Sequence, residues 1–427
     1  MSSQSKRTGT GMLAKAYAIA TTLAAPVVAT GLLAFRRGRV RFRERLGGWG
    51  SIPGAPWWFH GASVGEVQGL SPVLRLLKQE KPAEQVLLTC TSPTGLERGN
   101  SLADFTRLMP IDAPFLVRRA LRAVTPKHFV IAETELWPEL MRQALEQKVP
   151  ISIVNGRISD YTERWYSRFG ALFWPIVSQC SLICVPDEQQ RERFVALGAP
   201  PERVHVTGHT KYDVAPRFSA QDARERCRAS LFGGLSASSR ILVLGSVRPD
   251  EEPWWLDACA EAWSAGHDLR LVVVPRHQEK FSLFASRLKA RSIEFVRWSE
   301  LGPGEPARGR VILVDAMGEL EGCYAAADLA FVGATLVDVG GHNPLEPAMY
   351  GVPVVVGPHI AVIRGIVEEL RSWRGVIEVS SAQEISGVVR RMFSGSGELA
   401  ETGARGKAVW QRHLGSAQRV LRLLEGV

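Results

Sequence analysis

The stretch from Gly340 to Pro347 combines two glycines with a predicted helix start, a pattern typical of phosphate binding. We expect Asn343 to cap the helix, Pro344 to be its first residue, followed by Leu345, and Glu346 to complete a capping box. Glycines let a backbone turn approach a ligand closely, and unpaired N–H groups at a helix start attract phosphate. We therefore interpret this stretch as a nucleotide-binding loop.

Glu66 is the first candidate for acid–base chemistry. It ends the motif HGASVGE, which follows an apolar run expected to be a strand. Ligands bind α/β sheets outside the carboxyl ends of strands, so Glu66 is expected to face a cleft between two domains. Its spacing from Ser63 also fits a capping box, which needs no catalytic role. The sequence leaves both interpretations open: a helix cap, or a general base kept ionised by the helix start.

Two further motifs place charges at expected strand ends. Glu133 and Glu135 follow the strand expected at 128–132. In an extended chain they point to opposite faces, so at most one is expected to enter the site. Alternatively, they stabilise the start of the next helix. Lys211, in the motif GHTKYD, suits neutralisation of a phosphate or of developing charge, although isolated surface lysines are commoner.

In the second half, charged or glycine-containing turns follow several expected strands. They include Arg248 and three groups of candidate ligand-binding residues: Pro275 and Arg276; Met317, Gly318 and Glu319; and Asn343 to Glu346. Strand ends of one sheet converge, so these turns are expected to share a crevice. Arg276 suits a phosphate and Glu346 suits ribose hydroxyls. Two nearby histidines, His277 and His342, fit a ligand site or an ordinary structural role.

No Asp-x-Asp motif follows a strand to hold a divalent ion, so no metal is expected. Helix starts, Lys and Arg would instead neutralise the charge of a nucleotide. The cysteines show no zinc spacing and indicate a reduced compartment, where most would be small core residues. They are Cys90, Cys180, Cys184, Cys227, Cys259 and Cys323.

An uncharged segment, Ala16 to Phe35, is long enough for a helix to span roughly 30 Å of hydrocarbon. Six arginines follow it: Arg36, Arg37, Arg39, Arg41, Arg43 and Arg45. By the positive-inside rule they keep the rest of the chain in the cytoplasm. A span, a shallow insertion lying in the interface, and a cleaved signal peptide all fit, but the arginines oppose export. The net charge of +9 favours an acidic partner.

The chain's 427 residues indicate more than one domain. Apolar runs alternate with amphipathic segments, which predicts two doubly wound α/β domains with parallel sheets and a cleft between them. The expected parts are an anchor at 1–45, an N-terminal domain at 46–217, a linker at 218–239, a C-terminal domain at 240–403, and one closing helix at 404–427, which could cross back onto the N-terminal domain.

Taken in order, seven motifs resemble those of the 3-deoxy-D-manno-octulosonic acid (Kdo) transferases of lipopolysaccharide synthesis. They are HGASVGE, ETELWP, NGRIS at 155–159, GHTKYD, PRHQEK at 275–280, MGEL and GGHNPLEP. Together they cover nearly the whole chain from Trp57 onward. The combination is far more specific than any single motif.

The resemblance implies a GT-B glycosyltransferase with two Rossmann-like domains facing a central cleft and an N-terminal membrane-anchor helix. It implies inverting transfer of Kdo from CMP-Kdo to a lipid A precursor, lipid IVA, an anionic phosphorylated lipid, at the cytoplasmic side of the inner membrane. No metal, cofactor or nucleic acid is implied, and the oligomeric state stays open. Glu66 would be the base, and Glu133 and Lys211 would stabilise the transition state. The CMP site would be Pro275 and Arg276, Met317 to Glu319, and Asn343 to Glu346.

Three places depart from the commoner family wording: Gly333-Ala334-Thr335, His209-Thr210 and Gly156. These are small or loop changes, and activity is expected to persist. Three alternatives are a GT-B transferase of another nucleotide sugar, a sugar-nucleotide epimerase, and a catalytically silent membrane-bound binding protein. The arginine-flanked anchor argues against the epimerase, which would be soluble. Retention of the two acids and the lysine together argues against the silent protein.

Overall fold

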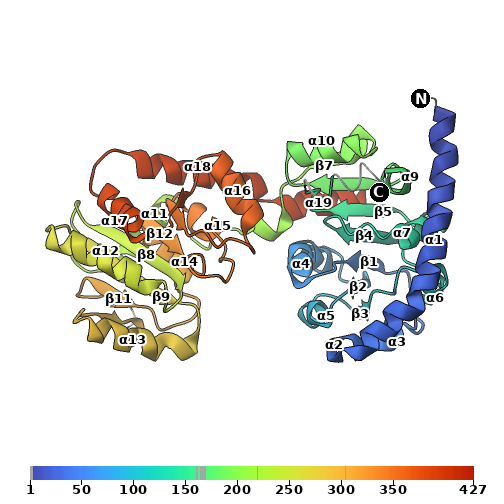
Figure 1. Cartoon of the computed structure of the whole chain (residues 1–427). Helices are drawn as coiled ribbons and strands as arrows, with labels where there is room; N and C mark the ends of the chain where they lie inside the picture. The colour runs from blue at the N-terminus through green and yellow to red at the C-terminus, as the bar shows by residue number, and fades with distance from the viewer. Residues whose placement is uncertain (1–2, 160–161, 164–169, 219, 303) are drawn as a thin grey trace. The chain divides into compact units, whose positions relative to one another are not determined.

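The computed structural model describes residues 3–159, 162–163, 170–218, 220–302 and 304–427. They form two compact units, coloured by chain position in Figure 1. Unit 1 contains Met1–Asp213 and His413–Val427, and unit 2 contains Val214–Arg412. Each unit is built on a parallel sheet of 7 strands. The expected α/β fold with two doubly wound units is confirmed.

The sheet of unit 1 has the order β3-β2-β1-β4-β5-β6-β7. Its strands are β1 (Trp57–His60), β2 (Val86–Cys90), β3 (Phe105–Leu108), β4 (His128–Ala132), β5 (Ile151–Val154), β6 (Leu182–Val185) and β7 (Val204–Val206). The chain moves outward from β1 to β3 and then returns to β4 on the other side of β1. The carboxyl ends of β1 and β4 therefore flank the point where strand order reverses, which is where doubly wound sheets bind ligands.

Both faces of this sheet are buried, which explains why its strands are apolar throughout rather than alternating. Trp58 and Phe129 pack on one face, and Phe59 and Val130 pack on the other. The helices of unit 1 after α1 are α2 (Arg36–Arg39), α3 (Phe42–Arg45), α4 (Val64–Glu80), α5 (Pro93–Gly99), α6 (Pro114–Ala123), α7 (Pro138–Glu146), α9 (Gly170–Val177), α10 (Glu188–Ala196) and α19 (Ser416–Glu425).

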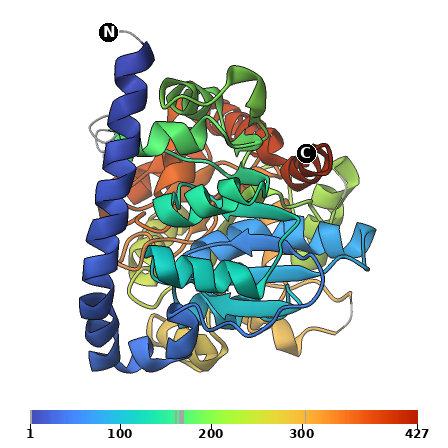
Figure 2. The same cartoon turned by 90° about the vertical axis from the view of Figure 1, so that its right-hand side faces the viewer.

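Helix α1 (Ser3–Ala34) runs along one side of unit 1, where it contacts α6, α7 and α9 (Figure 1, Figure 2). Its segment Met12–Ala34 is long and apolar enough to cross a membrane, by length and composition alone. The Tyr17 hydroxyl donates a hydrogen bond to the Asp112 carboxylate at 2.9 Å. Ala25 is buried beside Leu116 at the start of α6. The helix is thus attached to unit 1 by both polar and apolar contacts.

The sheet of unit 2 has the order β10-β11-β9-β8-β12-β13-β14. Its strands are β8 (Arg240–Val247), β9 (Leu269–Pro275), β10 (Val296–Arg297), β11 (Val311–Leu313), β12 (Leu329–Val332), β13 (Val354–Val356) and β14 (Ile377–Glu378). Its helices are α11 (Ala220–Leu231), α12 (Glu252–Ser264), α13 (Phe281–Ala290), α14 (Leu320–Ala326), α15 (Leu345–Ala348), α16 (Arg364–Ser372), α17 (Ala382–Arg391) and α18 (Glu398–His413). Strand order reverses between β8 and β12.

Several segments differ from expectation. The region 218–239 contains α11, whose Leu231 is buried in the core of unit 2. The segment 404–427 is two helices rather than one, because Gly415 interrupts it with φ 73° between α18 and α19. The edge strands β3 and β14 were not predicted, since a short, partly exposed edge strand lacks a strong apolar run.

Candidate functional site

Glu66 lies in the first turn of α4, directly after β1. The Ser63 hydroxyl accepts a hydrogen bond from the Glu66 N–H at 3.2 Å and lies 2.8 Å from carboxylate Oε1 as a donor. Carboxylate Oε2 accepts the Ala62 N–H at 2.7 Å. The predicted reciprocal cap therefore forms. It also fixes the carboxylate at the carboxyl edge of the sheet, so capping and a place in the site are compatible.

Burial raises the pKa of Glu66, and the hydrogen bonds from Ser63 and Ala62 oppose this rise only in part. The cap and the helix start were expected to keep Glu66 ionised. Desolvation of the half-buried carboxylate acts in the opposite direction. A carboxylate with a raised pKa is a stronger proton acceptor once it is ionised, because general-base efficiency increases with the pKa of the base.

Glu133 and Glu135 are both near enough to Glu66 to interact with it, although an extended chain would point them to opposite faces. Glu133 has a φ of 53°, so the chain after β4 is not extended and the alternation of side chains is lost. Burial and the charge of Glu66 both raise the pKa of Glu133. Burial, Glu66 and Glu133 raise the pKa of Glu135 to about 7. Both acids are therefore close enough to Glu66 to interact with it.

Lys211 is half-buried in a short 3₁₀ turn after β7. Beside it, the Thr210 N–H donates to Asn155 Oδ1 at 2.9 Å, and Asn155 Nδ2 donates to the Thr210 hydroxyl at 2.8 Å. That hydroxyl donates in turn to the carbonyl of Gly69 in α4. These buried contacts hold the Lys211 turn against the helix that carries Glu66. Asn155 belongs to one of the sequence motifs. Its hydrogen bonds to Thr210, which we call the Asn155–Thr210 clamp, join residues far apart in the chain.

The two cationic side chains Lys211 and Arg157 lower the pKa of Glu133, opposing the effect of burial. Unit 1 thus gathers Glu66, Glu133, Glu135, Arg157 and Lys211 where the strand order reverses beside β1 and β4. Such a site combines a proton acceptor with cations suited to stabilising negative charge.

The candidate ligand residues of unit 2 also follow the carboxyl ends of parallel strands. Arg248 comes after β8, Arg276 after β9, and Met317 to Glu319 after β11. Pro275 is the last residue of β9 and is buried, whereas Arg276 is exposed. Met317 and Gly318 are also exposed, and the Arg217 guanidinium donates to the Gly318 carbonyl at 3.4 Å.

The glycine-rich loop leads into α15, which has only four residues. Asn343 Oδ1 accepts the Leu345 N–H at 3.1 Å, as expected of a cap. Within the described part of the chain, no hydrogen bond joins Glu346 to the Asn343 N–H, so the predicted capping box is wrong. Burial raises the pKa of Glu346 and Arg276 opposes this rise, which places the carboxylate near that guanidinium. A helix of four residues also has a smaller dipole than the sequence suggested.

The two loop glycines adopt backbone conformations that other residues avoid. Gly340 has φ 106° and Gly341 has φ 89°. A Cβ atom on Gly341 would lie 2.5 Å from the Ile363 side chain. Next to them, burial and nearby Arg276 and Arg248 lower the pKa of His342 to about 4, so its imidazole is neutral at physiological pH.

Glu251 is a residue that the sequence did not single out. It is fully buried, and its carboxylate accepts the N–H groups of Ala334, Thr335 and Leu336 at 2.8 to 2.9 Å. It also accepts the Arg248 N–H at 2.9 Å. This carboxylate therefore fixes the loops after β8 and β12 at the reversal point of unit 2. The contacts connect residues more than 80 positions apart, so no local signal could have revealed them.

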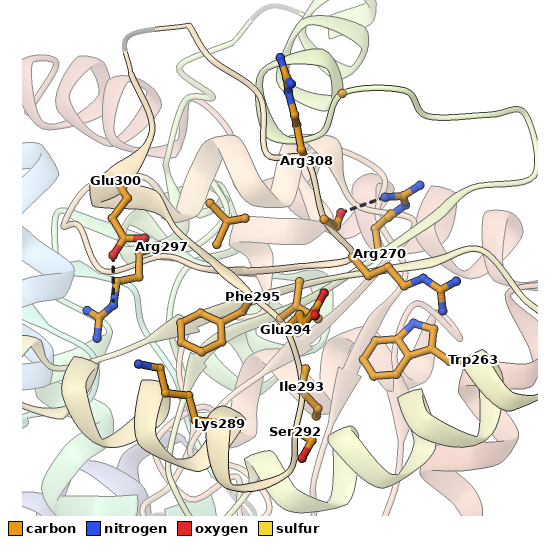
Figure 3. Close-up of a pocket in the computed structure, with 15 residues that line it drawn as sticks. Trp263, Arg270, Lys289, Ser292, Ile293, Glu294, Phe295, Arg297, Glu300 and Arg308 are labelled. Atoms are coloured by element: carbon orange, nitrogen blue, oxygen red, sulfur yellow. Dashed lines mark hydrogen bonds and ion pairs between the residues drawn. The ribbon is translucent and has the colours of Figure 1, made fainter.

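A hollow of about 1160 Å³ lies elsewhere in unit 2, and Figure 3 shows the side chains around it. It is lined by residues such as Arg270 at the start of β9 and Arg310 and Val311 at the start of β11. Strand starts lie at the edge opposite the motif residues. Arg270 and Arg297 are already paired, with Asp268 and Asp315 respectively. This hollow therefore lies at a different edge of the sheet from the candidate ligand residues.

In the described ranges, no group of three or more His, Cys, Asp or Glu side chains is arranged to hold a metal ion. All six cysteines are buried and unpaired, consistent with the predicted core roles.

Comparison with known proteins identifies relatives along nearly the whole chain. Residues 40–214 match the family model of 3-deoxy-D-manno-octulosonic-acid transferase (kdotransferase). The 3-deoxy-D-manno-octulosonic acid transferase of Haemophilus influenzae is 35% identical over 408 residues, covering 92% of this chain and 93% of that protein. The corresponding protein of Aquifex aeolicus is 31% identical over 80% of this chain and 87% of its own.

One solved structure in particular shares the fold. The UDP-GlcNAc 2-epimerase of Neisseria meningitidis is 13% identical, covers 87% of this chain and 100% of its own, and has a TM-score of 0.52. At that identity the likeness concerns the fold alone. The C-terminal CMP-Kdo binding domain of WaaA from Acinetobacter baumannii is 30% identical, covers 41% of this chain and 91% of its own, and has a TM-score of 0.39. The similarity to the curated relatives covers both units, and on that basis the chain belongs to the family of Kdo transferases, glycosyltransferases of lipopolysaccharide synthesis.

Proposed function

We propose that this Kdo transferase moves Kdo from CMP-Kdo to the lipid A precursor lipid IVA, with inversion at the anomeric carbon and without a metal ion. The observation that carries this proposal is the set of three acids and two cations at the reversal point of unit 1. An inverting transfer needs a carboxylate that accepts the proton of the attacking hydroxyl. Glu66 is a half-buried carboxylate with a raised pKa, held there by its cap.

The other residues supply charge stabilisation and donor binding in this proposal. Lys211 and Glu133 stabilise the transition state, and Lys211 offsets negative charge as CMP departs. Arg276 binds the donor phosphate, since guanidinium groups pair with oxyanions in a bidentate manner. Pro275, Met317 to Glu319 and Asn343 to Glu346 form the rest of the CMP site. With these cations in place, the leaving phosphate is neutralised by side chains.

The reaction takes place at the cytoplasmic side of the inner membrane, where the lipid acceptor resides. The support is the apolar segment Met12–Ala34, followed by exposed arginines in α2. Such arginines are retained on the cytoplasmic side and attract anionic lipids.

The proposal is tested with purified protein, CMP-Kdo and tetraacylated lipid A precursor. Wild-type protein is expected to release CMP and form a Kdo-lipid, whose mass gives the number of Kdo units added. Glu66→Ala is expected to bind CMP normally and to lose about 10²- to 10⁴-fold in kcat, the range for removal of a general base. Normal turnover by Glu66→Ala would show that this carboxylate is not the base.

Ser63→Ala is the matched control, because it removes the hydroxyl that caps α4 but leaves the Glu66 carboxylate. We expect it to lower the free energy of unfolding by about 1 kcal/mol and to retain most of the activity. An equal loss of turnover in both variants would mean that the cap, rather than proton transfer, explains the Glu66 effect.

A further inference from the structure

One face of α1 lies against unit 1 over most of the apolar segment. The less exposed positions are spaced by three or four residues, as on one side of a helix: Ala14, Tyr17, Ala18, Thr21, Ala25, Ala29 and Leu32. Most are small, which allows close packing. At 1.5 Å per residue this contact face is about 27 Å long. The helix axis therefore follows the surface of unit 1 rather than projecting from it.

The opposite face of α1 carries larger apolar side chains that are exposed. Met12 is 72% exposed, Ile19 62%, Leu23 73% and Val27 71%. On neighbouring helices, Phe115 of α6 and Trp174 of α9 are also about half exposed. An interfacial helix usually has a charged face toward water. Here unit 1 covers that face instead, which explains why the segment Met12–Ala34 of α1 contains only one charged residue, Lys15.

The contacts of α1 would carry charged groups into the hydrocarbon if the helix crossed the bilayer. Tyr17 and Ala14 share a hollow of about 340 Å³ with Arg142 and Glu146 of α7. Ala25 packs on Leu116 of α6, the same helix that carries the exposed residues Arg118, Arg119 and Arg122. A charged side chain near the bilayer centre is strongly disfavoured, even on the most permissive insertion scales. A spanning α1 would therefore bring the exposed arginines of α6 and the Arg142–Glu146 ion pair of α7 into the hydrocarbon.

We propose that α1 lies flat in the membrane–water interface beside unit 1, with Met12, Ile19, Leu23 and Val27 facing the lipid, and does not cross the bilayer. This inference rests on the proposed membrane location. The apolar face enters the outer part of one leaflet, roughly 5–10 Å deep. The exposed residues Arg36, Arg37 and Arg39 of α2 then meet anionic headgroups at the end of the helix.

The test measures depth along the helix in the full-length protein. Single nitroxide labels are placed at Met12→Cys, Ile19→Cys, Leu23→Cys and Val27→Cys, positions whose exposure favours normal folding. The six native cysteines are buried, so brief labelling spares them. The protein is bound to vesicles of phosphatidylethanolamine and phosphatidylglycerol, and depth is read from collisions with oxygen and with a water-soluble nickel chelate. Glu97→Cys, an exposed position on α5, is the matched control and should report water.

A flat helix predicts the same shallow depth at all four positions. A span predicts depths that change by about 16 Å between Met12 and Leu23, from 1.5 Å rise per residue, with the greatest depth near Leu23. That gradient, or four labels that all report water, would overturn the proposal.

A second measurement is independent of the vesicles. In intact cells, Ser3→Cys should resist a membrane-impermeant maleimide and react only after lysis, whereas labelling from outside would require a span. Turnover of CMP-Kdo by the same labelled proteins is assayed separately. Shallow labels without any turnover would contradict the proposed function and leave the membrane arrangement intact.

Discussion

Glu133 shows how one backbone angle changes the chemistry of a site. Its φ of 53° lies in the left-handed region, which costs an ordinary residue roughly 1–2 kcal/mol. The Glu133 N–H donates to the Val154 carbonyl of the neighbouring strand at 2.8 Å, which helps to hold this conformation. As a result Glu133 and Glu135 both interact with Glu66. The motif identified these acids, but only the fold shows that the charge of Glu66 acts on both of them.

The burial of Glu135 near two other acids predicts a pH-dependent stability. Burial, Glu66 and Glu133 raise the pKa of Glu135 from 4.5 to about 7. The folded protein therefore holds this proton more tightly than the unfolded chain, so the stabilisation is complete below about pH 4.5 and is lost as pH rises through 7. We expect Glu135→Gln to remove that loss of stability. Between pH 5 and pH 8 its free energy of unfolding should increase by about 2 kcal/mol relative to wild type, allowing for solvent screening.

Urea unfolding at pH 5 and at pH 8 measures the difference in stability between Glu135→Gln and wild type. Glu97→Gln, which changes an exposed acid on α5, is the matched control and should show no such dependence on pH. A stability difference between Glu135→Gln and wild type that stays constant from pH 5 to pH 8 would contradict the raised pKa of Glu135.

At the scale of elements, Asp112 connects α1 with the helix that follows the acidic motif. Its buried carboxylate accepts the N–H groups of Glu139 at 3.1 Å and Leu140 at 2.9 Å in the first turn of α7. It also accepts the Tyr17 hydroxyl of α1 at 2.9 Å. The helix start at Pro138 has no cap from its own neighbour Trp137. A residue distant in sequence therefore does the capping, and a local sequence pattern could not predict it.

We expect Asp112→Ala to lower the free energy of unfolding by about 2–3 kcal/mol, because it leaves two amide donors and a hydroxyl without their acceptor. Tyr17→Phe removes one donor and keeps the cap, so its cost should be about 1 kcal/mol. Chemical denaturation of both variants measures this ranking. If Tyr17→Phe proved as costly as Asp112→Ala, the hydroxyl contact rather than the cap would dominate.

At the scale of the whole molecule, the chain returns to unit 1 at its end. Val420, Leu421 and Leu424 of α19 are buried in the same core as strand residues of unit 1. The Asp213 carboxylate accepts the Gly415 N–H at 2.7 Å and the Ala417 N–H at 2.8 Å. The core of unit 1 is therefore incomplete until the last residues of the chain are in place.

Leu421→Ala should destabilise unit 1 by about 2–5 kcal/mol, as expected for a cavity left by a buried leucine. Leu288→Ala, which truncates a fully buried leucine in α13 of unit 2, is the matched control. Hydrogen exchange read by mass spectrometry should show faster exchange in the strands of unit 1 for the first variant and in those of unit 2 for the second. Faster exchange confined to unit 2 in Leu421→Ala would contradict this assignment.

The sequence by itself determined the α/β class, most strands of both sheets and the family. Buried parallel strands are continuous apolar runs, and the motifs are short and contiguous, so both are visible locally. The candidates Glu66, Glu133 and Lys211 were also singled out in this way, and their roles stay a prediction. The edge strands β3 and β14 were missed because half-exposed segments of two to four residues carry little periodic signal.

Only the tertiary structure decided which groups meet. The left-handed turn at Glu133, the carboxylate of Glu251 holding three distant amides, and the Asn155–Thr210 clamp all depend on contacts between remote segments. The same is true of α1, whose composition fits a span but whose small-residue face packs along unit 1. Composition reports how apolar a helix is, whereas the surface it packs against decides which of its faces remains for lipid.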